Sequence, residues 1–291
     1  MNIEDGLEEH MNPISAANGV TLSIEERLKL ETQLDKLKSD IKSDEMWFWG
    51  KIMGVEKDYY VAEAIYYKEH PVFPQKKFFF CSSSNFIFSE LPEIQEHHLP
   101  DFPKFNTYFI GNPDIILEKY EDRQTTGIID EEEIEKGNFN PVLKKKNLTE
   151  SDRLSYVVRS IENDTSVVPM GGFKMLPIKE MRRNDILEGL PSEEIDQLGK
   201  YFHFRAPQNQ NKKDLIAMGK AVFDFGFLDS IEEDKIKGSW SIQVDSAKTV
   251  SNIRSMIWPG YFAYHKTNTT MFGGVYIGYG IKNVDIPFMQ Q

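Results

Sequence analysis

The sequence predicts an α+β fold built mainly on antiparallel β-sheet, with a long N-terminal helix and a few further helices. Near the C-terminus, Trp240, Ile242 and Val244 alternate with polar residues, which is the period of two that a half-buried strand requires. Near the N-terminus, leucines recur at spacings of three and four, which indicates an amphipathic helix. Short aromatic-rich segments separated by turn residues favour antiparallel pairing, because a tight turn can join antiparallel neighbours.

The predicted N-terminal helix begins at Ser23. Its hydroxyl can cap the first free amides while Glu26 reaches back, in a capping box. Leu30 and Leu34 continue the apolar face, and the helix is expected to end near Ser43. The residues before it are small, polar and acidic, so residues 1–20 are predicted to be a disordered acidic tail.

The middle of the chain alternates between predicted strands and turns. Residues 46–55 and 58–67 are apolar enough for two strands, and residues 70–113 suggest short strands joined by proline-marked turns. Residues 121–147 hold an acidic run and then a lysine run, which predicts a charged loop or insertion. A helix capped by Thr149 follows.

The segment after this helix is less regular. A short helix is expected over Ser192–Phe204, because Ile195, Leu198 and Phe202 recur at helical spacing. A loop or helix is expected over Lys212–Asp234, with its phenylalanines and Leu228 packed inside.

Composition excludes several classes of protein. The formal charge of −12 makes nucleic acid and anionic membrane poor partners. The single cysteine, Cys81, forbids an internal disulfide or a cysteine-based zinc site. No stretch approaches the ~20 apolar residues of a membrane span, and the acidic N-terminus has no signal-peptide pattern. We therefore expect a soluble, intracellular protein of the cytoplasm.

The motifs that could carry chemistry are incomplete. Gly171–Gly172 lacks the lysine and hydroxyl of a phosphate loop, and the glycines after Met271 sit between strand residues instead of opening a helix. The adjacent His97 and His98 have no evident third metal ligand. We predict no catalytic, cofactor-binding or metal-binding residues. A small hydrolase that uses His203 and an acid such as Asp229 stays open as an alternative.

Several short blocks along the chain, taken in order, resemble the radial spoke head protein 9 family of motile cilia and flagella. They are Phe48–Ile52, Asp58–Tyr60, Gly111–Pro113, Glu188–Leu190, Tyr201–Pro207, Asp229–Ser230, Lys237–Gln243, Trp258–Gly260, Tyr276–Gly280, Lys282–Asn283 and Asp285–Phe288. The resemblance extends over most of the chain. It implies a single domain over residues 21–291, with the charged segment 121–147 inside it.

The resemblance also implies a non-enzymatic subunit of the radial spoke head in the axoneme. Such a subunit would help relay central-pair signals to dynein arms and support spoke assembly and ciliary motility. Implied partners are the larger related head proteins, the MORN-repeat head protein, the spoke stalk scaffold and central-pair projections. A cytosolic assembly adaptor for axonemal complexes stays open as an alternative. Candidate structural or interface residues within the blocks are Trp49, Tyr59, Tyr60, Tyr201, His203, Arg205, Trp240, Trp258, Pro259, Tyr276 and Tyr279.

The strand pattern around Trp240 leads to a first prediction. If Trp240 faces the core, Trp240→Ala should lower the free energy of unfolding by about 3–5 kcal/mol, as large core truncations do. Urea denaturation of the two proteins measures the difference. A change within experimental error would mean that Trp240 is exposed and belongs to an interface.

Overall fold

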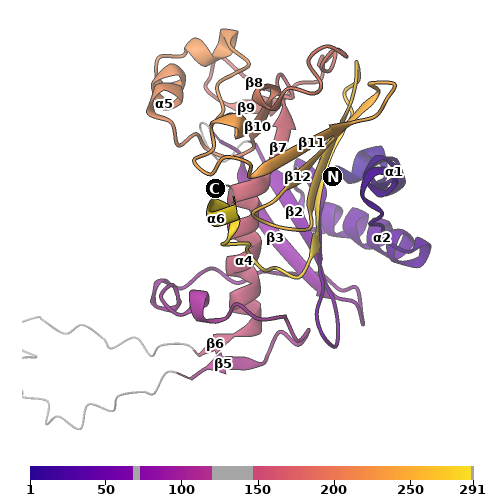
Figure 1. The fold of residues 1–291 in the computed structure, drawn as a ribbon. Helices are drawn as coiled ribbons and strands as arrows, with labels where there is room; N and C mark the ends of the chain where they lie inside the picture. The colour runs from indigo at the N-terminus through magenta and orange to yellow at the C-terminus, as the bar shows by residue number, and fades with distance from the viewer. Residues whose placement is uncertain (68–72, 120–146, 290–291) are drawn as a thin grey trace, which may run out of the picture.

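The computed structural model describes residues 1–67, 73–119 and 147–289, and its centre is an eight-stranded sheet (Figure 1). The strand order is β11-β12-β13-β14-β1-β2-β3-β4. The N-terminal strands are β1 (Glu45–Ile52), β2 (Tyr59–Tyr66), β3 (Gln75–Ser82) and β4 (Ser89–Glu90). The C-terminal strands are β11 (Trp240–Val244), β12 (Val250–Ser255), β13 (Tyr261–Lys266) and β14 (Phe272–Gly278).

Neighbouring strands in this sheet are antiparallel, with one exception where the two ends of the chain meet. Strands β1 and β14 run parallel, with Gly50 opposite Tyr276. Strand β1 has an irregularity between Phe48 and Gly50, and Gly50 has a φ of +155°. A Cβ atom on Gly50 would lie 2.1 Å from the Tyr276 carbonyl oxygen, so only glycine lets the two backbones approach this closely. The predicted α+β class with a mainly antiparallel sheet is confirmed.

The first 20 residues are not a disordered tail, and that prediction is wrong. A 3-10 turn, η1 (Ile3–Asp5), is followed by helix α1 (Leu7–Asn18). Leu7, Met11 and Ile14 are fully buried, at the spacings of four and three that place side chains on one helix face. The Tyr264 hydroxyl lies 2.6 Å from Nδ1 of His10. This apolar stripe is too short to stand out among the polar residues around it.

One helix was predicted near the N-terminus and the structure has two, because α1 lies in the predicted tail and a second helix lies in the segment predicted to be helical. Helix α2 (Ile24–Ile41) begins at the predicted cap, because the Ser23 hydroxyl and Glu26 form the expected capping box. Leu30 and Leu34 are buried against the sheet. Helices α1 and α2 cover one face of the sheet, and helix α4 (Glu150–Thr165) lies on the other face (Figure 1).

Helix α4 (Glu150–Thr165) confirms the helix predicted after Thr149, which forms a capping box with Asp152. Leu154, Val158 and Ile161 are buried in a core cluster shared with the sheet. The charged segment predicted over 121–147 lies outside the described residues, apart from Asn147.

The remaining elements are short. They are β5 (Ile116–Glu118), β6 (Leu148–Thr149), β7 (Val167–Pro169), β8 (Phe173–Met175), β9 (Met181–Arg183), β10 (Tyr201–His203), α5 (Gln210–Ala217) and α6 (Ile286–Met289), with 3-10 turns η2 (Glu96–His98), η3 (Phe102–Lys104), η4 (Leu198–Lys200), η5 (Lys220–Phe223) and η6 (Ile231–Glu233). Across the described ranges, no helix has the length and apolar character needed to cross a membrane.

Two further expectations are corrected here. The helix predicted over Ser192–Phe204 is wrong, because η4 leads directly into strand β10, which pairs with β7. Phe227 and Leu228 pack in the core as expected. Phe223 is 91% exposed and Phe225 is 52% exposed, so sequence spacing alone did not show which phenylalanines face outward.

A buried ion cluster joins α4 to the sheet. The Lys76 ammonium on β3 lies 3.1 Å from a Glu63 carboxylate oxygen on β2 and also pairs with Glu162 on α4. The Trp49 indole donates to the other Glu162 oxygen at 3.0 Å, and Lys76 also donates to the Phe204 carbonyl at 2.9 Å. Burial raises the pKa of Glu63 above its usual range, with the Glu162 charge adding to the effect and Lys76 opposing it.

The contribution of the Lys76 ammonium to the free energy of unfolding can be tested by replacing the side chain. Lys76→Met should destabilise the fold by about 3–5 kcal/mol, because it leaves buried carboxylates without their partner. A carboxylate whose pKa is raised on folding destabilises the folded state more as pH rises. The decrease in unfolding free energy caused by Lys76→Met should therefore be larger at pH 8 than at pH 6. Urea denaturation at both pH values measures it.

Lys77→Met is the matched control, because Lys77 is the next residue on β3. Its side chain is 42% exposed and its nearest carboxylate partner, Glu90, is 4.0 Å away. Its loss should change the unfolding free energy by less than about 1 kcal/mol. Equal effects of the two variants would contradict the structural role given to Lys76.

Candidate interaction surface

The candidate residues fall into a large buried group and a small surface group. Eight of them are less than 9% exposed: Trp49, Tyr59, Tyr60, Tyr201, His203, Trp240, Trp258 and Tyr276. Arg205 is partly buried, while Pro259 and Tyr279 are exposed. The structure therefore gives most of these side chains an internal setting, and their hydrogen bonds show what they hold together.

Four of the candidates, Trp49, Tyr59, Arg205 and Trp258, donate hydrogen bonds to helix α4. The Tyr59 hydroxyl donates to Glu150 at 2.7 Å, and the same carboxylate accepts from the amides of Ile110, Gly111 and Asn112 at 2.8–3.2 Å. Glu150 is fully buried, and these four donors replace the water that would otherwise solvate its charge. They fix the loop before β5 onto the first turn of α4.

The last turn of α4 is held in a similar way. The Trp258 indole and the Lys282 ammonium both donate to Asp164 at 2.9 Å, and Nε of Arg205 donates to the Asn163 carbonyl at 2.9 Å. Charge-assisted hydrogen bonds of this length are the stronger kind. Residues from the β12–β13 turn, from the loop after β10 and from the C-terminal segment are thus brought to one end of a single helix.

Tyr60 acts on the opposite face of the sheet. Its hydroxyl donates to Glu26 of α2, which also pairs with Lys51 at 2.9 Å. Partial burial alone would raise the pKa of Glu26, but the hydrogen bonds from Tyr60, Lys51 and the Ser23 amide lower it to about 2. This capping-box residue therefore also docks α2 onto the sheet.

Two other candidate tyrosines close local loops. The Tyr201 hydroxyl donates to the Ile195 carbonyl at 2.8 Å and lies 2.7 Å from the Ser251 hydroxyl. The Tyr276 hydroxyl accepts from the Gly280 amide at 2.9 Å. Burial, the largest cause, raises the pKa of Tyr276 to about 12, so this hydroxyl keeps its proton and its structural bond at neutral pH.

A hollow of about 480 Å³ lies beside the end of α4 and has His203, Arg205, Asp229 and Asp234 among its lining residues. The predicted pairing of His203 with Asp229 is not formed by their side chains. Nε2 of His203 lies 2.9 Å from Asp234, whereas the Asp229 carboxylate accepts from Arg205 and from the amides of Gln208 and Asn209 at 2.6–3.2 Å.

These hydrogen bonds indicate that the ionic side chains of the hollow stabilise the fold. Asp234 also accepts from the Trp240 indole at 2.7 Å. Burial would raise the pKa of Asp234, but the bonds from His203 and Trp240 and the nearby charges hold it below its usual value. A hydrolytic site needs a nucleophile within hydrogen-bond reach of its base. In the part of the chain that the structure describes, no hydroxyl or thiol is hydrogen-bonded to His203.

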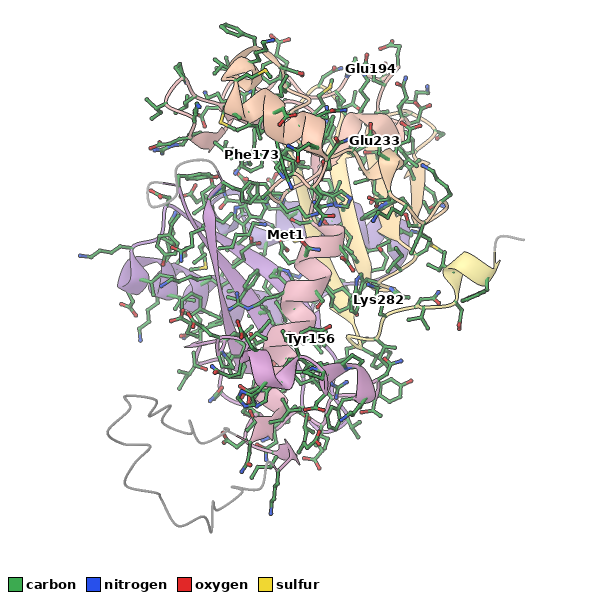
Figure 2. All side chains as sticks on the ribbon, turned by 90° about the vertical axis from the view of Figure 1, so that its left-hand side faces the viewer. Met1, Tyr156, Phe173, Glu194, Glu233 and Lys282 are labelled. Carbon is green, nitrogen blue, oxygen red and sulfur yellow. The ribbon has the colours of Figure 1, made fainter. Side chains whose placement is uncertain are left out.

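Three smaller hollows, with volumes of about 320, 240 and 190 Å³, share lining residues with the first one. Lys282 lines all four, and we call the series the α4 trough. Figure 2 shows α4 in front of the sheet, with Tyr156 and Lys282 on the side that faces the viewer. Tyr156 lines the second and third hollows.

The far end of the α4 trough carries exposed aromatic side chains. Tyr108 and Tyr279 are 55% and 50% exposed, and their ring centroids are 5.0 Å apart in an edge-to-face contact. With Pro259 they line the 190 Å³ hollow. Val284, which lines the neighbouring hollow, is 62% exposed. Apolar groups gathered along a groove are typical of a protein-binding surface.

Sequence reasoning missed Tyr108, Tyr156 and Lys282 as residues of this surface. Tyr156, Ser160 and Asn163 follow one another at spacings of four and three on α4, so a stripe opposite the buried face was detectable in the sequence. Tyr108 and Lys282 carried no such local signal, because they come together only through long-range packing. Among the described residues there is no cluster of three or more potential metal ligands.

The chain is similar in sequence to a known protein family. Residues 4–195 match the family model described as radial spokehead-like protein. The chain is 35% identical over 277 residues to the radial spoke head protein 9 homolog of Danio rerio, with 95% of this chain and 96% of that protein covered. It is 31% identical over 276 residues to the radial spoke head protein 9 homolog of Homo sapiens, with the same coverage.

The bonds around Asp234 can be tested by removing its carboxylate. Asp234→Ala should lower the unfolding free energy by about 1–3 kcal/mol, because it leaves the His203 ring and the Trp240 indole without their partner. Thermal and urea denaturation measure the change.

Glu233→Ala serves as the control, because Glu233 lines the same hollow but is exposed. It should change the unfolding free energy by no more than about 0.5 kcal/mol. If Asp234→Ala were as stable as this control, the assigned role of Asp234 would be wrong.

Proposed function

Because the chain belongs to the radial spoke head protein 9 family, we propose that it is a structural, non-enzymatic subunit of the radial spoke head in the axoneme of motile cilia and flagella. In this role it would help relay central-pair signals to dynein arms and support spoke assembly. The observation that carries the proposal is the α4 trough. Its exposed apolar residues lie beside α4, and hydrogen bonds hold α4 to the sheet and to the C-terminal segment.

The rigidity of these walls suits an assembly role. The trough's floor is α4, which is bonded to the sheet through Glu150 and Glu162 and to the C-terminal segment through Asp164. A preorganised surface loses less conformational entropy when a partner docks. At one end of the trough, His203 bonds Asp234 and Arg205 bonds Asp229. This arrangement favours a role in binding a partner over a catalytic role.

We propose that other spoke components occupy this surface. The candidates are the larger related head proteins, the MORN-repeat head protein, the spoke stalk scaffold and projections of the central pair. The apolar end, with Tyr108, Tyr279 and Val284, suits the apolar centre of such an interface. The ionic end, with Glu233 and Lys235 exposed, suits its polar rim.

The experiment uses motile cells whose own copy of the protein has been replaced by wild type or by a variant. Isolated cilia are extracted with detergent and then with high salt, and the chain is detected in each fraction beside other spoke proteins. Wild type should resist detergent and be released together with spoke components. The double variant Tyr108→Ser/Tyr279→Ser should shift to the detergent-soluble fraction, because it removes both exposed rings from the trough.

Leu28→Ser is the matched control. Leu28 is 61% exposed on α2, on the other face of the sheet, so its loss should leave the chain with the axoneme. All three variant sites are exposed, so the unfolding free energies should agree within about 1 kcal/mol. Wild-type protein in the detergent extract, or in the cell body alone, would refute the spoke-head role and favour an assembly adaptor. An unaffected double variant would refute the trough as the docking surface.

A further inference from the structure

The two edges of the eight-stranded sheet are unequal. At one edge, β4 has only two residues, Ser89 and Glu90, and carries a charge. At the other edge, β11 has five residues, Trp-Ser-Ile-Gln-Val, with neither charge nor proline. Folded proteins normally protect sheet edges with short strands, charges or prolines, because unpaired backbone groups attract another strand. Strand β4 is protected in this way, and β11 is not.

The register shows which backbone groups of β11 point outward. The Ser239 carbonyl accepts a hydrogen bond from the Met256 amide at 2.8 Å, and the Asp245 amide donates to the Val250 carbonyl at 3.2 Å. Hydrogen-bonded and non-hydrogen-bonded pairs alternate along an antiparallel ladder, so Ser241 and Gln243 also bond β12. The N–H and C=O groups of Trp240, Ile242 and Val244 therefore point away from the sheet.

These outward groups form a regular row at two-residue spacing. Within residues 1–67, 73–119 and 147–289, no backbone hydrogen bond reaches them from another segment. The side chains of β11 are well anchored, with Trp240 buried and Ile242 packed on the core shared with α4. The edge is thus both available and rigid, which is the condition for adding a strand.

We propose that a second copy of this chain pairs with β11 in an antiparallel arrangement, across a two-fold axis at Ile242. This proposal does not depend on the spoke-head role, because it concerns the isolated chain. A two-fold axis makes the same patch meet itself, and the strand is self-complementary under that operation. Trp240 lies opposite Val244 of the second copy, Ser241 lies opposite Gln243 of the second copy, and Ile242 meets its own equivalent.

This register satisfies both faces of the extended sheet. The apolar residues of β11 continue one face, and the polar Ser241 and Gln243 continue the other, so no side chain meets a neighbour of the wrong character. No charged residue within β11 opposes another. Beyond the strand, Lys237 lies diagonally across from Asp245 of the second copy, which places opposite charges at each end.

The net charge of −12 opposes the pairing at long range. Salt screens such repulsion, with a Debye length of about 10 Å at 0.1 M and about 3 Å at 1 M. Backbone hydrogen bonds and apolar contacts are weakened much less by salt. Association through β11 should therefore strengthen as sodium chloride increases, whereas association through ion pairs would weaken.

The first test measures the mass of the purified full-length chain by sedimentation velocity, between 1 and 200 µM and at two salt concentrations. A monomer–dimer equilibrium that tightens with salt is expected. Ile242→Pro should weaken it at least tenfold, because proline removes an outward N–H that takes no part in the β11–β12 ladder. Ile242→Val, which keeps that N–H, should dimerise like wild type. A monomer under all conditions would overturn the proposal.

The second test fixes the register and holds even if the proline variant folds poorly. Opposed non-hydrogen-bonded residues in an antiparallel pair have Cα atoms about 4.5 Å apart, within the range of a disulfide. The sole native cysteine, Cys81, is buried, so introduced thiols report alone. An equimolar mixture of Ser241→Cys and Gln243→Cys should form a crosslinked dimer under mild oxidation. Each variant alone should crosslink far less, and equal yields in all three samples would refute this register.

Discussion

The buried ion pair between Glu162 of α4 and Lys76 of β3 holds the helix against the sheet. Glu162 also receives the Trp49 indole, so a helix, an edge-side strand and a central strand meet at one carboxylate. A buried charge is tolerated only where partners surround it. This requirement fixes the position of α4 along the sheet. Everything that is built on α4, including the trough, inherits that position.

The joint between β1 and β14 imposes a second constraint. It is the one parallel pair in the sheet, and it brings the two ends of the chain together where Gly50 contacts Tyr276. The long segment between β4 and β11 must therefore leave the sheet at one edge and return at the other. Helix α4 belongs to this segment and crosses one face of the sheet. Helices α1 and α2 cover the other face.

The aromatic residues in the resembling blocks connect these constraints. Tyr59, Trp49 and Trp258 each place an apolar ring in the core and donate one hydrogen bond to a carboxylate of α4. Large amphipathic rings suit this use, because they bury much area and still carry a donor. Sequence alone could not separate that internal role from an interface role. Both roles select the same residue types, and of the candidates only Pro259 and Tyr279 are exposed, with Arg205 partly buried.

The α+β class, the mainly antiparallel sheet, the caps at Ser23 and Thr149 and the apolar face of α4 could all be predicted from the sequence. Each of these follows from local periodicity or from hydrogen bonds within a few residues. Three features could be seen only in the tertiary structure: the helix α1 within the predicted disordered tail, the pairing of His203 with Asp234, and the assembly of the α4 trough. Those features depend on contacts between residues far apart in the chain. Such contacts are set by the parallel joint and the buried charges, which leave no repeating signal in the sequence.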